Sequence, residues 1–310
     1  AEVIEELKDG RKHPAVHTYT STLHSFAAFS GDAMPMNEVF TPGRLKEYED
    51  WLLQRRLSWN TISTYMRTLQ AVYNRLSPPG TPEHNPRLFD DVYTKVKSQI
   101  KRALTEEQMG RLMHADLDVL SEELQRVQAY FLLMFLFRGM PFIDLAHLRK
   151  RDVKDGKIAY RRHKTGKQIT LRIPREALPL LKEFKDKDET SLYLFPILNA
   201  APEGDDALYE CYQKALRNFN KMLRVLAKRL LPGIKISSYT ARHTWATLAY
   251  HIGMPIGIIC QALGHSSIRV TETYLKPFEN EKVDKANRKL ISTVKKHEGR
   301  SGRCFIYYKT

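Results

Sequence analysis

Three runs in the last third of the chain decide the fold. They are Ser238-Tyr-Thr-Ala-Arg-His-Thr-Trp-Ala-Thr247, then Ala262-Leu-Gly-His-Ser-Ser-Ile268, then Thr271-Glu-Thr-Tyr-Leu275. In this order they contain Arg242, His265 and Tyr274. An arginine can bind an anionic group through two parallel hydrogen bonds, a histidine can hydrogen-bond it, and a tyrosine can attack it as a nucleophile. A lone Leu-Gly-His run would be weak evidence, whereas the ordered set at these spacings is specific.

The ordered set resembles the tyrosine recombinase (phage integrase) family, in which His-x-x-Arg-His-Thr is followed by Leu-Gly-His-Ser and then by a tyrosine. The resemblance extends upstream to Arg138-Gly-Met-Pro-Phe-Ile-Asp-Leu145, to Leu148-Arg149 and to His163-Lys-Thr-Gly-Lys167, and covers most of the chain. It implies a site-specific recombinase that cleaves and rejoins DNA strands through a 3′-phosphotyrosyl intermediate. The outcome would be integration, excision or inversion of DNA, as for a mobile element.

Transfer of a phosphodiester needs a nucleophile, charge stabilisation on the non-bridging oxygens and an acid for the leaving oxygen. Tyr274 is the expected nucleophile, and Arg242 is expected to grip the phosphate in a fixed fork. We expect His265 to hydrogen-bond the phosphate or to assist proton transfer. Lys164 is expected to protonate the departing 5′ oxygen, with Lys167 as its nearest alternative. No metal, ATP or other cofactor is expected, since no Asp/Glu/His cluster has ligand spacing.

Tyr239 departs from the family pattern, which has a histidine three residues before the arginine. A phenol can donate a hydrogen bond to a phosphate oxygen, but it does not become a cation at neutral pH. We therefore expect a secondary role for Tyr239. The neighbouring His243 faces a different way on a helix and is as well explained by a structural role as by a catalytic one.

The first arginine of the family pattern is also missing, because Pro141 occupies its position when Asp144-Leu145 is aligned with the usual Glu-Leu. Arg138 lies one helical turn upstream, and we expect its long side chain to substitute. Arg149 and Arg151 are the alternatives. Asp144 would orient neighbouring groups or cap local backbone.

The chain is expected to be mainly α-helical, with an N-terminal helical core-binding (SAM-like) bundle and an α+β catalytic domain that contains a small antiparallel sheet. Apolar residues at helical spacing predict helices at 13–31, from Thr41-Pro42 onward and at 60–76. The expected organisation is a helical DNA-binding domain at 1–95, a basic linker at 96–104, a catalytic domain at 105–297 and a tail at 298–310. Residues 301–310 have an odd composition and no assigned role.

Within the second domain, Thr105 and Gln108 form a capping-box pattern that opens a helix. A buried helix is expected at 122–137, and further helices at 207–229 and from near Thr240 and Pro255. Short strands are expected at 157–163 and 167–173 around the Thr165-Gly166 turn.

Two sets of residues are candidate DNA contacts. On the 207–229 helix, cations at spacings 3, 4, 3, 4 stack along one stripe, where a DNA backbone would supply the missing anions. The stripe consists of Lys214, Arg217, Lys221, Arg224 and Lys228. The 60–76 helix presents Thr64, Arg67 and Asn74 opposite its apolar face as major-groove readers. A solvated face without a partner is the alternative for both sets.

The composition favours a polyanionic partner, because 50 Lys and Arg stand against 35 Asp and Glu, giving a net charge of +15 and a pI of about 9.6. The longest strongly apolar run, residues 129–137, is too short to span a bilayer. No secretory leader opens the chain, so secretion is not expected. Because the first residue is Ala and not Met, the native N-terminus is expected to be missing. The three cysteines are odd in number and far apart. They suggest a reducing cytoplasm. For a DNA recombinase the expected location is a bacterial-type cytoplasm, in association with the nucleoid.

The expected partners are double-stranded DNA and three further copies of the chain, because the resemblance implies a homotetramer on two DNA sites that passes through a Holliday junction. It also implies that a segment after Tyr274 docks on a neighbour, for which residues 281–297 are suitable. An accessory DNA-bending protein is a further possible partner. The alternatives are a type IB topoisomerase, which relaxes DNA as a monomer, and a DNA-binding regulator with a decayed site.

Overall fold

The structure is a computed structural model that describes residues 4–6, 13–31, 35–95, 103–115, 120–199, 204–275, 277–278 and 280–298. It divides into two compact units, one of residues 1–100 with 200–213 and one of residues 101–199 with 214–310. Most of the linker expected at 96–104 lies outside the described residues, as does the tail from 299 onward. The domain boundaries therefore stay a prediction.

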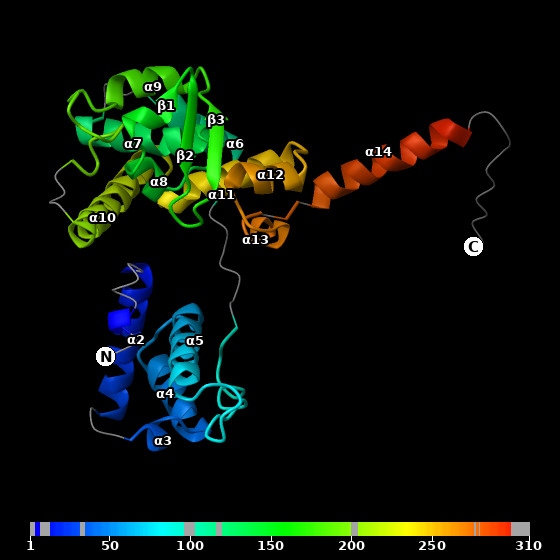
Figure 1. Ribbon diagram of the computed structural model, residues 1–310. Helices are drawn as coiled ribbons and strands as arrows, with labels where there is room; N and C mark the ends of the chain where they lie inside the picture. Colours follow the sequence, from blue (N-terminus) through cyan, green and yellow to red (C-terminus); the bar gives the residue numbers. More distant parts are fainter. Residues whose placement is uncertain are drawn as a thin grey trace. The chain divides into compact units, whose positions relative to one another are not determined.

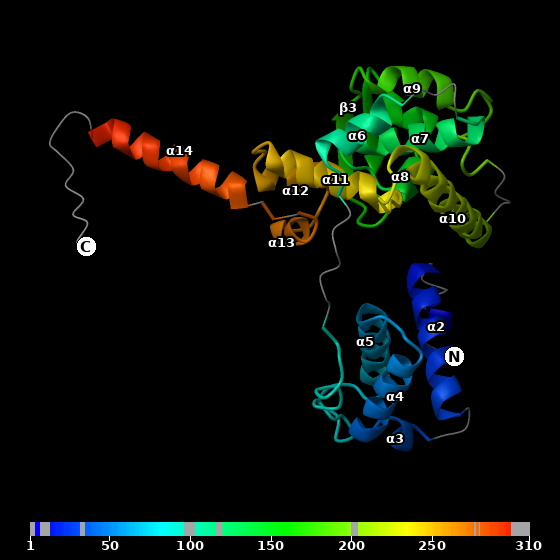
Figure 2. The same ribbon diagram turned by 180° about the vertical axis from the view of Figure 1, so that it is seen from behind.

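The first unit is a helical bundle around an aromatic-rich core. Its helices are α2 (His13–Ser30), α3 (Met36–Val39), α4 (Pro42–Gln54) and α5 (Trp59–Leu76). Thr41 and Ser58 cap α4 and α5 by accepting hydrogen bonds from backbone N–H groups of the first turn. Phe26, Tyr48 and Ile62 come from three different helices and lie in one buried cluster. Figures 1 and 2 both show α2, α4 and α5 side by side, so the three predicted helices form the predicted bundle.

The second unit is also mainly helical. Its helices are α6 (Glu106–Met113), α7 (Glu122–Leu136), α8 (Phe142–Ala146), α9 (Ala177–Phe184), α11 (Ser238–His251), α12 (Ile256–Leu263), α13 (Ile268–Glu272) and α14 (Asn280–Glu298), together with α10 (Asp205–Leu230) from residue 214 onward. The capping box that opens α6 at Thr105 is present as predicted. The helix expected to begin near Thr240 begins earlier, because Ser237 and Thr240 form a capping box at its start.

The sheet has three antiparallel strands in the order β1 (Val153–Lys154), β2 (Lys157–Arg161) and β3 (Gln168–Arg172). The predicted hairpin is present, but both strands are shorter than expected because the chain leaves the ladder at residue 162 and rejoins it at 168. Buried and exposed residues alternate along β2 and β3, as a sheet with one covered face requires. In Figure 1 the loop end of the hairpin lies near α11 and α12.

No helix among the described residues is long and apolar enough to cross a membrane.

Candidate active site

Arg242 lies at the centre of the site, on the second turn of α11, with a side chain that is only 2% exposed. Its Nη1 donates to the carbonyl oxygen of Gly139 at 2.7 Å, and its Nη2 donates to the carbonyl oxygen of Leu263 at 2.6 Å. Nε is buried and has no hydrogen-bond partner in the described part of the chain. Burial and the nearby charge of Arg162 lower the pKa of Arg242. A buried guanidinium held by carbonyls and lacking a bound carboxylate is suited to an incoming anion.

Two glycines make room for this arrangement. Gly139 has φ +69°, and a Cβ there would lie 3.1 Å from the Arg242 Cα. Gly264 ends α12 in the left-handed conformation at φ +63°, and a Cβ there would lie 2.8 Å from the Ile169 Cδ1. Gly264 is therefore required both for the turn after α12 and for close packing against the sheet.

His265 follows Gly264 and is 4% exposed. Its Nε2 lies 2.9 Å from Arg242 Nη2, and its Nδ1 lies 2.9 Å from the Thr271 hydroxyl. Because a guanidinium only donates, Nε2 must accept, so the ring is neutral and its Nδ1 donates to Thr271. Burial, with the charges of Arg242 and Arg162, lowers the pKa of His265 to about 3. In this state both ring nitrogens are occupied and His265 orients Arg242, so its expected roles toward the phosphate stay predictions.

Tyr274 lies just after α13, and its half-buried ring packs against the same cluster. The ring centroid lies 4.7 Å from that of His243 and 4.8 Å from that of His265. The Arg242 Cζ lies 5.6 Å from the centroid of the Tyr274 ring. The backbone oxygen of Tyr274 accepts long hydrogen bonds from His243 Nδ1 and the Thr247 hydroxyl, each 3.4 Å. The sequence motif thus brings its arginine, histidine and tyrosine together in space, with His243 as a support for Tyr274.

Tyr239 opens the same helix as Arg242 and is 47% exposed. Desolvation raises the pKa of Tyr239, and so does the neighbouring Tyr274. The Tyr239 ring centroid lies 6.0 Å from that of His243, which itself packs on Tyr274.

Lys164 lies at the exposed tip of the β2–β3 hairpin. Its charge is close enough to lower the pKa of His265, and so is that of Lys167. The hairpin therefore brings both candidate proton donors into the electrostatic range of the cluster.

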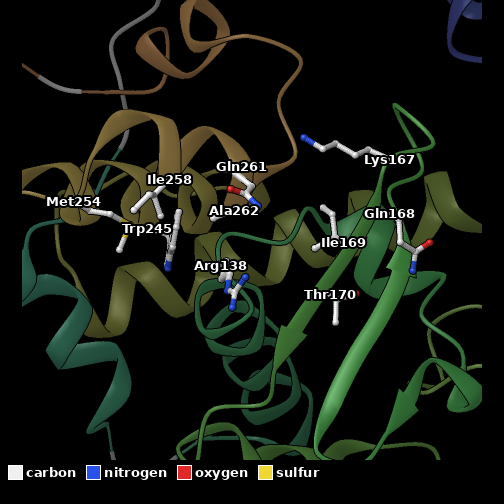
Figure 3. Close-up of a pocket in the computed structure, with 10 residues that line it drawn as sticks. All are labelled: Arg138, Lys167, Gln168, Ile169, Thr170, Trp245, Met254, Ile258, Gln261 and Ala262. Carbon is white, nitrogen blue, oxygen red and sulfur yellow. The ribbon is translucent and has the colours of Figure 1, made fainter.

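Arg138 sits in the turn after α7 in a left-handed conformation, φ +59°, which is uncommon for a residue other than glycine. Its side chain lines a pocket of about 450 Å³ between the hairpin and α11–α12. Figure 3 shows its guanidinium between Trp245 and Ile169, with Lys167 reaching over from the hairpin. The adjacent Gly139 holds Arg242, so the strained turn connects the two arginines. A catalytic role for Arg138 stays a prediction. The alternatives Arg149 and Arg151 line a different pocket, with His147 and His163.

Sequence reasoning missed Arg162, a second arginine in the cluster that is 4% exposed. Its Nη1 donates to the carbonyl oxygen of Gly264 at 2.7 Å. The sequence does contain evidence that Arg162 is buried, because it continues the alternation of Ile158 and Tyr160 on the covered face of the hairpin. Asp144 lies near both buried arginines, and burial raises its pKa against their charges. Its Oδ1 accepts a hydrogen bond from the His163 backbone N–H at 2.8 Å, so it does fix local backbone.

The candidate DNA contacts are on two other helices, α10 and α5. All five cations of the α10 stripe are exposed: Lys214, Arg217, Lys221, Arg224 and Lys228. On α5, Arg67 and Asn74 are exposed and Thr64 is partly buried, with its hydroxyl bonded to the Asn60 carbonyl. DNA contact by either set stays a prediction.

A buried arginine, a neutral histidine and a phenol close together are groups of the kind that covalent phosphoryl transfer to tyrosine requires. Comparison with known proteins agrees with that class. Residues 102–281 match the Phage integrase family, and residues 1–76 match the Phage integrase SAM-like domain. Among curated proteins, the chain is 25% identical over 303 residues to the tyrosine recombinase XerA of Pyrococcus furiosus, covering 93% of this chain and 94% of the relative.

Solved structures share the fold. A Tn1549 transposon integrase in complex with transposon right end DNA superposes with a TM-score of 0.67 at 16% identity, covering 93% of this chain and 97% of that one. A lambda integrase tetramer bound to a Holliday junction gives a TM-score of 0.62 at 15% identity, covering 89% of this chain and 76% of that one.

The chain therefore belongs to the phage integrase family of tyrosine recombinases. Membership in this family makes site-specific DNA recombination its activity. The resemblance and fold class predicted from the sequence are confirmed, and neither the topoisomerase nor the decayed regulator is favoured.

Proposed function

We propose that this recombinase cleaves DNA with Tyr274 as nucleophile and rejoins it by the reverse step. The Tyr274 phenol releases its proton to solvent, its oxygen attacks the scissile phosphorus and forms a bond to it, and the bond to the 5′ oxygen of the leaving strand breaks. The phosphate stays on the 3′ strand as a phosphotyrosyl ester, and Lys164 gives a proton to the departing 5′ oxygen. One phosphoester replaces another of similar energy, so the reaction needs no ATP and is reversible.

The main support for this proposal is that Arg242, His265 and Tyr274 are in contact in one cluster. Arg242 supports the phosphate role because its Nε is buried without a partner among the described residues. His265, neutral and bonded through Nε2 to Arg242, keeps that guanidinium oriented. Tyr239 and Arg138 are proposed as further donors to the phosphate oxygens.

We also propose the assembly that family membership suggests. Four protomers would hold two DNA sites and exchange strands through a Holliday junction, in the nucleoid of a bacterial-type cytoplasm and with an accessory DNA-bending protein where the target requires one. The described part of α14 supports subunit docking, since it exposes an apolar set on a single helix. Its members are Val283, Leu290, Ile291 and Val294, each at least 45% exposed.

The test is a product assay on supercoiled plasmids carrying two copies of the DNA that flanks the protein's own gene. Site-specific recombination predicts inverted or excised products whose junctions lie at one sequence. Relaxed circles without recombinant junctions would instead indicate topoisomerase chemistry. Binding without either product would indicate the regulator.

A further inference from the structure

Arg162 is a buried cation to which the mechanism above gives no role. Its backbone closes the hairpin loop that contains Lys164. The Arg162 N–H donates to the Lys167 carbonyl at 2.9 Å, and the Gly166 N–H donates to the Arg162 carbonyl at 2.8 Å. Any movement of Arg162 must therefore move the whole Lys164 loop.

The side chain of Arg162 ties this loop to the catalytic cluster. Its Nη1 donates to the carbonyl oxygen of Gly264, the residue directly before His265. The next residue of the loop is tied as well, because the His163 N–H donates to Asp144. The two bonds run to different elements, α12 and α8, so together they fix the base of the loop in position and direction.

The side chain of Arg162 is bound at one end to the turn before His265, while its backbone carries the lysine loop. Its Nη1 is bound to the Gly264 carbonyl, only 4% of the residue is exposed, and its Nε, like that of Arg242, has no partner among the described residues. Lys164, two residues on, is exposed at the tip. The contacts therefore describe a buried anchor that carries an exposed lysine.

We propose that Arg162 is the positioning residue for proton donation by Lys164, and that its bond to Gly264 sets the distance between the lysine and the Arg242–His265–Tyr274 cluster. This inference rests on the proposed function, in which Lys164 protonates the 5′ oxygen. A small misplacement of a reacting group can slow a reaction by about 100-fold, so removal of the anchor should be visible in the cleavage rate alone.

The experiment compares two cleavage substrates, one with the natural 5′ bridging oxygen and one with sulfur in its place. A thiol is far more acidic than an alcohol, so the sulfur leaves without a proton donor. Single-turnover cleavage is measured for the full chain and for the variants Arg162→Gln, Arg162→Lys and Lys164→Ala. Arg172→Gln is the matched control, because Arg172 is exposed at the far end of the same hairpin.

We expect Arg162→Gln to cleave the oxygen substrate about 100-fold more slowly and the sulfur substrate at close to the parental rate, as Lys164→Ala should. Arg162→Lys keeps the positive charge but loses the planar guanidinium, so it should show the same pattern more weakly. It replaces Arg162→Gln in the comparison if that variant fails to fold. If Arg162→Gln slowed cleavage of both substrates equally, or cleaved the oxygen substrate at the parental rate, this inference would be overturned and the proposed function would still stand. Failure of sulfur to rescue Lys164→Ala would remove the general-acid role of Lys164, and the inference with it.

Discussion

The hydrogen bond between Arg242 and His265 requires a neutral imidazole, and this has a consequence for stability. The pKa of His265 in the folded chain is about 3, well below the value near 6.5 of an unfolded histidine. Between these values the unfolded state binds more protons, so stability is fully present above pH 6.5 and falls as the pH drops. We predict that His265 accounts for about 2 kcal/mol of unfolding free energy lost between pH 7 and pH 5.

Denaturant unfolding of the parent and of His265→Asn at several pH values measures this. The variant should lose less stability on acidification, whereas His17→Asn, on an exposed face of α2, is the matched control. Parallel curves for parent and His265→Asn would show that the ring is not held neutral.

The phenol of Tyr239 is predicted to assist cleavage modestly. Tyr239→Phe removes the hydroxyl that is proposed to bond a phosphate oxygen, and a neutral hydrogen bond contributes about 1 kcal/mol, so the rate should fall about 2- to 10-fold. Tyr239→His restores the usual family residue and should keep at least the parental rate. Single-turnover cleavage decides this, and a loss of several hundredfold in Tyr239→Phe would contradict a secondary role.

The sequence predicted the main residues of the candidate active site but not the hydrogen bonds that hold them. Arg242, His265 and Tyr274 were found because their spacing is fixed by the motif. Arg162 was missed because an arginine beside a hairpin lysine resembles a surface cation, and only the alternation along β2 marks it as buried. The bond from Arg162 to Gly264 joins residues far apart in the sequence, and local patterns carry no information about such pairs.

Among the elements, the end of α12 has the most demanding geometry. Gly264→Ala should destabilise the chain by about 1–3 kcal/mol, because the left-handed φ is strained for alanine and the new Cβ would meet the Ile169 side chain. Gly257→Ala, inside the same helix with nothing within 4 Å of its Cβ, should stabilise by about 0.5–1 kcal/mol. Thermal or denaturant unfolding measures both, and equal effects would contradict the packing argument.

The α10 stripe is predicted to bind the DNA backbone. Replacing Lys221 and Arg224 with glutamine should reduce the slope of log affinity against log salt by about 0.9 for each phosphate that the variant no longer neutralises. Lys182→Gln with Lys187→Gln, exposed cations at and after α9, is the control pair. DNA binding titrated at several salt concentrations gives the slopes. An unchanged slope in the α10 variant would identify the stripe as a solvated face.

Helices with strong periodicity and caps were predicted closely, as α5 and α6 show, since their signals are local. The two-residue strand β1 and the five-residue helix α8 were missed. Such short segments have too few residues for a period to emerge. They are held by neighbours instead, β1 by pairing with β2.

For the whole molecule, the exposed apolar residues of α14 are predicted to join protomers. Leu290→Asp with Ile291→Asp should leave cleavage of a single site unchanged but reduce tetramer formation on two sites at least about tenfold, since burying a charge in an interface is costly. Arg288→Asp on the same helix is the control. Analytical ultracentrifugation of DNA complexes measures the assembly, and intact tetramers in the double variant would remove α14 from the interface.

The most direct test of the central claim is covalent trapping. The full chain would be incubated with nicked duplexes carrying its target, denatured and analysed by mass spectrometry for a DNA-linked peptide. We expect an adduct through the oxygen of Tyr274 that is absent from Tyr274→Phe. An adduct at another residue, or one that persists in Tyr274→Phe, would show that Tyr274 is not the nucleophile.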